Sequence, residues 1–516
     1  MIRRRFVLLG VVAIAACTGG GGEGDSPATS AIASRPRQSA ASSTPVAFPV
    51  SSVPGVRHLV DAAGRPFGLR GRTAWYVLSR SAEEYARFLD DTRAKGFNAI
   101  EIKAITHDPD ANNPPFAGNG AAPFLKRLDG GKWLGSLRYS RIRTQAPDFT
   151  TPNETYWSFV DAFLDACQAR GIVVLMFPAY VGWGGGNQGW MQEMEANGAT
   201  RMQSYGNWIA NRYKGQSNLI WMLGGDYSDF TASQSAVEQE LVNGLKSVAG
   251  QTSTVYSAEW ASNSFGSDHG TFGRYLNFNG VYSWTGLTAS YGRKAYGFEP
   301  VTPSFLLEEP YDEEGPDGDG FNPSATQPVR RFVYWGLLST IGGYVAGNGY
   351  VWRFRTGWTY RDLFKTLRDT AGGRGIVWPP KTGWDLHLDT KGANDLKRLN
   401  DLLVSIDWWR LVPEGLSGMG TLVTQGSGSI DTGSYVAAAG TSAGDLLLAY
   451  IGPDHTGAVT IDMSRMRGTV SARWLDPTNG VYTAIGSYTN RGTQAFVTAG
   501  KNSAGDGDWI LRLDAL

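Results

Sequence analysis

Two acidic segments follow short apolar runs in the middle of the chain. Asp226 comes after 219–223 and two glycines, and Glu308 and Glu309 come directly after 304–307. Such runs are typical of buried parallel strands, and glycine lets the backbone approach its neighbours closely. Hydrolysis of a glycosidic bond needs a carboxylic acid and, in retaining enzymes, a carboxylate nucleophile about 5–5.5 Å from it. These carboxylates are therefore candidates for a catalytic pair, although Asp226 by itself could equally cap a helix.

The surrounding sequence alternates between apolar strands and amphipathic helices, with a small hairpin expected before them at 59–66. Eight strands are predicted, at 73–78, 97–102, 172–177, 219–223, 255–258, 280–283, 304–307 and 343–345. The helices between them include 81–95, which Ser81 and Glu84 would open as a capping box, 153–170, 199–213, 233–248 and 327–339. This order predicts an α/β fold, a (β/α)8 TIM barrel over 55–408, in which working groups lie at the C-terminal ends of the strands. A doubly wound sheet is the competing fold, but no Gly-x-Gly-x-x-Gly turn follows an early strand.

The last part of the chain has a different pattern. Short β segments at 435–439, 446–450, 458–461, 470–474 and 509–513 are separated by turns rich in Gly, Asn and Asp. This predicts a small C-terminal β-sandwich over 409–516. No long linker precedes it, so we expect it to pack directly on the barrel.

The N-terminus has the features of an export signal. Arg3-Arg4-Arg5 is followed by an apolar stretch, 6–16, that is too short to span a bilayer and that ends at Cys17. Ile14-Ala15-Ala16-Cys17 resembles a bacterial lipobox, which predicts a signal peptide over 1–17 and lipidation of Cys17. The alternative is an ordinary cleaved signal peptide with an incidental cysteine. Residues 18–54 are rich in Gly, Ser, Ala and Pro and predict a disordered tether, so we expect an exported protein anchored on the periplasmic or outer-membrane face of the cell envelope.

Composition limits the partners. Lys+Arg and Asp+Glu are both 47, so no basic excess would attract nucleic acid, and we expect membrane contact only through the lipid anchor. The chain contains 18 Trp, 22 Tyr and 22 Phe residues. Sugar rings can stack on the flat faces of such side chains, although aromatic residues also fill cores. The five His residues form no His-Glu-x-x-His motif, so we predict no metal site and no cofactor. Cys167 lies in an apolar helical rhythm and is predicted to be buried.

Several motifs together resemble a known family. They are Thr73-Ala74-Trp75, 95–98 (Lys-Gly-Phe-Asn), 152–157, 205–214 with 218–226 (ending Gly-Gly-Asp), Glu309-Pro310-Tyr311, and 342–348 with Trp352. In this order they resemble the DUF4038 barrel proteins, which are related to glycoside hydrolase family 140, the apiosidases. The C-terminal segments 409–413, 474–480 and 505–511 resemble a module described as a putative collagen-binding domain of a collagenase. We expect that module to support the barrel structurally rather than to bind collagen.

The resemblance implies a mechanism and a set of residues. It implies that Asp226 is the acid/base and Glu309 the nucleophile of a retaining glycoside hydrolase. Glu308 is expected to be an inert neighbour, because period-two alternation turns adjacent strand residues to opposite faces. The family usually has Asp where this chain has Arg72, which leaves the sugar specificity open. The residues expected to contact substrate are Arg72, Trp75, Glu101, Trp183, Tyr282, Trp284, Tyr311, Asn348 and Trp352.

The predicted substrate is an oligo- or polysaccharide with apiose- or furanose-containing side chains, of plant or bacterial origin. The rival interpretation is a non-catalytic lipoprotein that binds glycan or collagen.

Two further motifs in the sequence do not predict the functions with which they are usually associated. Gly440–Gly444 matches the serine-hydrolase Gly-x-Ser-x-Gly pattern but precedes a β segment rather than a helix. The acidic stretch 312–319 lacks the spacing of a calcium loop.

Overall fold

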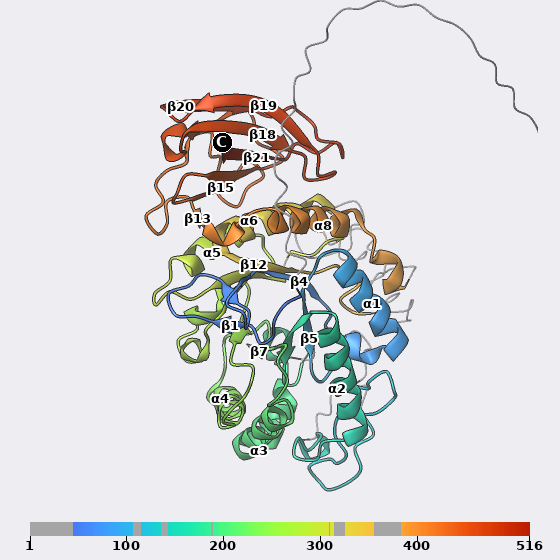
Figure 1. Ribbon diagram of the computed structural model, residues 1–516. Helices are drawn as coiled ribbons and strands as arrows, with labels where there is room; N and C mark the ends of the chain where they lie inside the picture. Colours follow the sequence, from blue (N-terminus) through green and yellow to red (C-terminus); the bar gives the residue numbers. More distant parts are fainter. Residues whose placement is uncertain are drawn as a thin grey trace, which may run out of the picture. The chain divides into compact units, whose positions relative to one another are not determined.

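The computed structural model describes residues 45–106, 115–135, 143–186, 189–308, 310–313, 326–354 and 383–516. Its larger part is a nearly closed barrel of parallel strands surrounded by helices (Figure 1). In order around the sheet the strands are β8 (Tyr256–Glu259), β7 (Leu219–Gly224), β6 (Val173–Phe177), β5 (Ala99–Lys103), β4 (Leu69–Thr73), β12 (Ile341–Ala346), β11 (Ser304–Leu307), β10 (Asn279–Tyr282) and the antiparallel β9 (Ser264–Phe265). The amides of Asn277 and Phe278 donate to the carbonyl of Tyr256 and close the ring between β8 and β10. The predicted (β/α)8 fold is confirmed.

The first barrel strand lies earlier than the sequence pattern predicted. It is β4, Leu69–Thr73, whereas 74–79 turns through a short 3-10 helix, Val77–Ser79. Leu69 and Gly71 face the barrel interior and the intervening arginines face outward, which hides the strand from a search for apolar runs. The run Ala74–Leu78, which was predicted to be a strand, is apolar because it is buried at the end of the barrel.

The helices match the prediction more closely. They are α1 (Ala82–Ala94), α2 (Glu154–Ala169), α3 (Met191–Arg212), α4 (Ala232–Lys246), α5 (Thr288–Tyr296), α6 (Thr326–Thr340) and α8 (Lys391–Val404). The predicted capping box of Ser81 and Glu84 opens α1. Helix α3 begins earlier than predicted because the chain continues through a break at Gly198 (φ 72°, ψ 170°). Helices α5 and α8 were not predicted, since both contain several polar residues and glycines.

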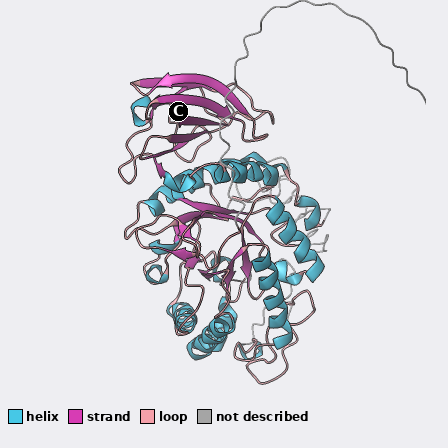
Figure 2. Cartoon of the chain, in the orientation of Figure 1, coloured by secondary structure: helices cyan, strands magenta, loops and turns pink. Residues whose placement is uncertain are grey.

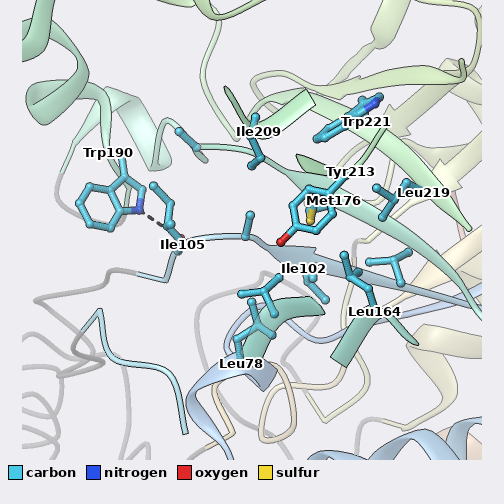
Figure 3. Packing of buried hydrophobic residues seen from close by; sticks show 14 of the residues in the cluster. Leu78, Ile102, Ile105, Leu164, Met176, Trp190, Ile209, Tyr213, Leu219 and Trp221 are labelled. Carbon is cyan, nitrogen blue, oxygen red and sulfur yellow. Dashed lines mark hydrogen bonds between the residues drawn. The ribbon is translucent and has the colours of Figure 1, made fainter. Parts of the chain in front are cut away.

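A large apolar layer lies between the barrel wall and the helices on β5, β6 and β7 (Figure 3). Met176 and Trp221 point outward from their strands into this layer, where they meet Leu164 of α2 and Ile209 of α3. Trp190, a candidate for sugar contact by its position, is 1% exposed and donates to the carbonyl of Ile105 at 3.1 Å, so it belongs to this core. Cys167 is buried on α2, as predicted.

The C-terminal region is a β-sandwich (Figure 2). One sheet runs β13 (Leu411–Pro413), β15 (Val436–Thr441), β16 (Leu446–Ile451), β21 (Trp509–Ala515), β18 (Thr469–Leu475) and β19 (Tyr482–Thr489). The other runs β14 (Val423–Gln425), β17 (Ala458–Asp462) and β20 (Thr493–Val497), and the two share a core. Strand β19 was not predicted because most of its side chains are solvent-accessible. A second apolar cluster joins the sandwich to α6 and α8, so it packs directly on the barrel.

The hairpin before the barrel is present as β2 (Leu59–Val60) and β3 (Pro66–Phe67). It is joined by β1 (Ser51–Ser52), and Val50 is buried, so 45–54 belongs to the folded part rather than to the expected tether. The apolar side chains of this segment meet the barrel interior cluster, which outweighs its Ser- and Pro-rich composition. Cys17 and the rest of the expected tether lie outside the described residues. No described helix is long and apolar enough to cross a membrane.

Candidate active site

Asp226 lies at the barrel mouth, by which we mean the end where the parallel strands finish. Strand β7 ends at Gly224, and Gly224, Gly225 and Asp226 all have positive φ angles of 73°, 131° and 49°. A Cβ at Gly224 would lie 2.4 Å from the carbonyl oxygen of Glu259, and one at Gly225 would lie 2.4 Å from the ring of Tyr180. Only glycine fits at both positions. A non-glycine residue in the left-handed region is characteristic of functional sites.

The surroundings of Asp226 favour its neutral form. The side chain is half-buried, and burial raises its pKa to about 7. A hydrogen bond from Tyr282, at the end of β10, and the charge of Lys103 act in the opposite direction but do not offset the burial. A carboxyl group with a pKa near neutrality can donate a proton at working pH, as a general acid requires.

Glu308 lies at the same mouth and is held by two donors. Its Oε1 accepts a hydrogen bond from Trp75 Nε1 at 2.6 Å and another from the hydroxyl of Tyr311. The indole N–H also lies 2.9 Å from the Tyr311 hydroxyl, so the three groups form a closed triangle. Glu308 is 6% exposed. Two donors on one carboxylate fix the direction of its oxygens.

The expectation that alternation would turn Glu308 away from the mouth is wrong. Inside β11, Phe305 and Leu307 face the barrel interior and Leu306 faces outward, so continued alternation would have turned Glu308 outward. The strand ends at Leu307, however, and Glu308 has φ 69°, which turns its side chain into the mouth. Alternation does not extend past the end of a strand. Glu309, the predicted nucleophile, lies outside the described residues.

Further charged groups lie in the barrel interior beneath these two carboxylates. With Asp226 and Glu308 they form what we call the mouth cluster, which also contains Glu101, Glu259 and Lys103. Burial raises the pKa values of Glu101 and Glu259 well above the usual range, and the charge of Glu308 adds to this effect. Both side-chain oxygens of Glu101 are buried without a hydrogen-bond partner among the described residues. One ammonium group cannot neutralise this many carboxylates, so some of them hold protons near neutral pH.

Lys103 is packed against aromatic rings. Its Nζ donates to the Tyr76 hydroxyl at 3.2 Å and lies 3.8 Å from the ring centre of Tyr180 and 5.1 Å from that of Trp75. Tyr180 in turn donates to Oε1 of Glu259 at 3.2 Å. Lys103, Glu259 and Tyr180 are not among the residues that the sequence predicted for the site. The signal for Lys103 was available, because Glu101 and Lys103 stand two positions apart in an otherwise apolar strand and so share its inner face.

Of the other predicted contact residues, Trp75, Tyr282 and Tyr311 touch Asp226 or Glu308 as described, and Trp352 lies close by. The Trp352 ring lies 6.3 Å from Tyr311 and 6.0 Å from Tyr76, centre to centre. Trp183 and Trp284 follow β6 and β10 at the mouth and are 65% and 38% exposed.

Arg72 and Asn348 are not brought to this cluster. Arg72 points outward from β4, where it pairs with Asp91 of α1 at 2.6 Å and lies over Phe88. Period-two alternation explains this, because Thr73 and not Arg72 shares the inner face with Leu69 and Gly71. Asn348 links two loops: its side-chain amide donates to Asp312, after β11, and its side-chain oxygen accepts from the amide of Tyr350. Neither residue touches a group of the mouth cluster. No metal-binding group of three or more His, Cys, Asp or Glu side chains occurs among the described residues.

Comparison with known families identifies the barrel. The family model of the apiosidase-like catalytic domain matches residues 54–410. The chain belongs to the apiosidase-like family. A second model, the putative collagen-binding domain of a collagenase, matches 426–514. A comparison with proteins of curated function found no match.

Solved structures agree with this fold. One described as a glycoside hydrolase is similar to this apiosidase-like chain with a TM-score of 0.69 and 17% identity, covering 91% of this chain and 97% of the other. A glycoside hydrolase family 5 structure from Bacteroides vulgatus matches with a TM-score of 0.69 and 18% identity, covering 90% and 94%. A putative glycoside hydrolase from the same species matches with a TM-score of 0.61 and 12% identity, covering 91% and 82%. The chain is a glycoside hydrolase, and its substrate is a carbohydrate.

Proposed function

We propose that this apiosidase-like hydrolase is a retaining glycosidase in which Asp226 is the acid/base and Glu308 the nucleophile. The observation that carries the proposal is the contrast between the two carboxyl groups. Asp226 has a pKa raised to about 7 by burial, whereas Glu308 accepts hydrogen bonds from Trp75 and Tyr311. One environment favours a proton donor, and the other fixes the direction of an oxygen that could attack. We prefer Glu308 to Glu309, which the family resemblance had suggested, because the hydrogen bonds that would orient a nucleophile end on Glu308.

The reaction then follows two steps. Asp226 protonates the glycosidic oxygen while the Glu308 carboxylate attacks the anomeric carbon, which forms a covalent glycosyl–enzyme and releases the leaving group. Asp226, now ionised, takes a proton from a water molecule, which attacks the same carbon and releases both the sugar and Glu308. Trp75 and Tyr311 keep the nucleophile aimed, and the buried aromatic rings around it exclude water from the reacting carbon.

We propose that the substrate is a complex plant or bacterial polysaccharide with apiose or another furanose in its side chains. The apiosidase-like family match supports this choice. We also propose that the protein is exported and held at the periplasmic or outer-membrane face through a lipid on Cys17. The basic n-region, the short apolar stretch and the lipobox-like end of the signal sequence support this location.

The test is the incubation of the purified protein with apiose-bearing pectic oligosaccharides, followed by NMR of the product at early times. We expect release of a terminal sugar whose anomeric configuration at first matches that of the substrate. Initial formation of the opposite anomer would contradict the retaining mechanism. Release of sugars other than furanoses from arabinan, arabinogalactan or pectic substrates would contradict the proposed substrate but not the mechanism.

We propose that the C-terminal sandwich supports the barrel rather than binding collagen. Its contacts with α6 and α8 are apolar and extensive, and Arg330 of α6 is buried among carboxylates of the sandwich. A collagen pull-down with the whole protein is expected to give no retention above that of a non-binding control protein. Specific retention on collagen would contradict the supporting role.

A further inference from the structure

The aromatic residues at the barrel mouth differ sharply in their exposure. Trp75 and Tyr311, beside Glu308, are each 3% exposed. Trp183 is 65% exposed and Trp284 is 38% exposed, and neither indole contacts another aromatic ring of the described residues. Burying an indole is among the side-chain burials that lower the free energy of a protein most, and an exposed indole does not contribute this stabilisation. Exposed aromatic side chains held in place at a mouth indicate a binding surface.

The loop that carries Trp183 is fastened to the backbone of Asp226. The amide of Gly184 donates to the carbonyl of Asp226 at 3.3 Å, and the amide of Val181 donates to the carbonyl of Gly224 at 3.1 Å. Gly182, Gly184 and Gly185 have φ angles of 94°, 61° and 65°, which a chain of L-residues would rarely adopt. The indole is therefore presented at a fixed position relative to the acid, not carried on an unattached loop.

Trp284 is connected to the same carboxyl group from another strand. Tyr282, two residues before it, donates to Asp226. The amide of Trp284 donates to the hydroxyl of Ser262 at 3.1 Å, and Ser283 donates to the side chain of Asn263 at 2.7 Å. Around the barrel, Asp226 follows β7, Trp183 follows the adjacent β6, and Trp284 follows β10 beyond β8. Trp183 thus lies at the strand end next to the acid, whereas Trp284 follows the strand that pairs with β11, between the acid and Glu308.

The mouth is therefore asymmetric. Glu308 is contacted by the buried Trp75 and Tyr311, as a small subsite for the attacked sugar would be. The exposed Trp183 follows β6, which pairs with the strand of Asp226 on the side away from Glu308. In glycoside hydrolysis the acid protonates the oxygen of the leaving group, so the leaving group lies on the side of the acid. We propose that Trp183 is a stacking platform for a sugar ring of the leaving group. The enzyme would then recognise the glycan chain from which the terminal sugar is removed. This inference rests on the proposed role of Asp226 as the acid.

The experiment compares two substrates that share the transferred sugar. One is an apiose-terminated pectic oligosaccharide, and the other is apiosyl fluoride, whose leaving group has no ring. For Trp183→Ala we expect kcat/KM on the oligosaccharide to fall about tenfold, as expected for the loss of one stacking contact. Activity on the fluoride should change less than about twofold, and Trp183→Phe should retain most of the activity on the oligosaccharide. Val497→Ala, at an exposed apolar residue of the sandwich, is the matched control and should change neither.

Two results would overturn the platform. An equal loss on both substrates would mean that Trp183 supports Asp226 rather than the leaving group, and no loss on the oligosaccharide would mean that it does not contact the glycan. A binding measurement separates this inference from the proposed function. Short oligogalacturonides prepared from pectin are titrated against Glu308→Gln while tryptophan fluorescence is followed. The Glu308→Gln protein is compared with the double variant that also carries Trp183→Ala. If the double variant binds the oligogalacturonides about tenfold more weakly, the result supports the platform even if no apioside is cleaved. Equal binding by the two variants, or no binding by either, overturns it.

Discussion

Two buried groups of charges in this protein are built in opposite ways. The mouth cluster contains the carboxylates of Asp226, Glu308, Glu101 and Glu259 but only one ammonium group, that of Lys103. The other group, the Arg330 cluster, joins α6 to α8 and to the sandwich. In it the guanidinium of Arg330 contacts Asp395, Asp506 and both oxygens of Asp508, and Tyr450 donates to Asp508 at 2.7 Å.

The difference separates charges that do chemistry from charges that hold the structure. In the Arg330 cluster the guanidinium has a carboxylate on each of its nitrogens, and Asn502 donates to Asp508 at 2.9 Å. A fully hydrogen-bonded network of this kind specifies how two elements dock. In the mouth cluster, both oxygens of Glu101 and one oxygen of Glu259 lack partners among the described residues. Burial raises the pKa of Asp226 to about 7, as an acid catalyst requires. It also raises the pKa of Asp395, to about 6, but there the charge and the hydrogen bond of Arg330 oppose the effect.

The largest effect is expected at the nucleophile. Glu308→Gln keeps the size of the side chain and replaces the attacking carboxylate with a neutral amide, so kcat should fall at least about 10⁴-fold. Steady-state kinetics on an apiose-bearing oligosaccharide measures this fall, and circular dichroism checks the fold. Glu309→Gln is the matched control and should keep most of the activity. The reverse pattern would return the nucleophile to Glu309.

Loss of the acid should have a smaller effect that depends on the substrate. Asp226→Ala should lower kcat/KM about 10²- to 10⁴-fold on a natural glycoside. On apiosyl fluoride it should have much less effect, because fluoride departs without being protonated. For the wild-type enzyme on the natural glycoside, kcat/KM should fall as the pH rises through about 7, the pKa of Asp226. If kcat/KM of the Asp226→Ala variant still falls through the same alkaline pH range, another group is the acid.

Breaking the Arg330 cluster should affect stability and leave catalysis intact. Arg330→Ala leaves Asp508 and Asp395 buried without their counter-ion, which should lower the free energy of unfolding by about 3–5 kcal/mol. Urea denaturation measures the change. The kcat of the protein that remains folded should stay within about twofold of wild type. A stable variant with impaired kcat would contradict the division between the two clusters.

The smallest expected effect is on the pH dependence of stability. Burial raises the pKa of Glu238, whose Oε1 accepts from the amide of Gly224, to about 7 from 4.5. A raised pKa in the folded state stabilises the protein fully below the unfolded pKa, and this contribution is lost as the pH rises through about 7. Between pH 6 and 8 this carboxyl should account for about 1 kcal/mol of lost stability. Glu238→Gln should remove that part of the slope in urea denaturation, and an unchanged slope would contradict the raised pKa.

The sequence predicted most of the fold because alternation and capping are local properties. It placed Asp226 at the end of a strand, since the apolar run and the two glycines are adjacent in the chain. It misplaced the first strand because Leu69, Gly71 and Thr73 alternate with arginines, whereas the more apolar run at 74–78 covers the end of the barrel.

The candidate site was harder to predict, because it depends on what happens after the strands end. Glu308 has φ 69°, and strand alternation gave no reason to expect this. The same alternation does account for Arg72, which points to α1 because it lies inside a strand. The partners of Lys103 lie after β4 and after β6, so its surroundings follow from the barrel rather than from any one segment.

The most direct test of the central claim is to trap the glycosyl–enzyme. The wild-type protein is incubated with a 2-deoxy-2-fluoro apiosyl fluoride, digested, and analysed by fragmentation mass spectrometry. A retaining mechanism with Asp226 as the acid/base and Glu308 as the nucleophile predicts one added sugar per chain, on Glu308. A sugar on Glu309 would contradict the assignment. Turnover of the natural substrate with no trapped species at any time would contradict the covalent mechanism.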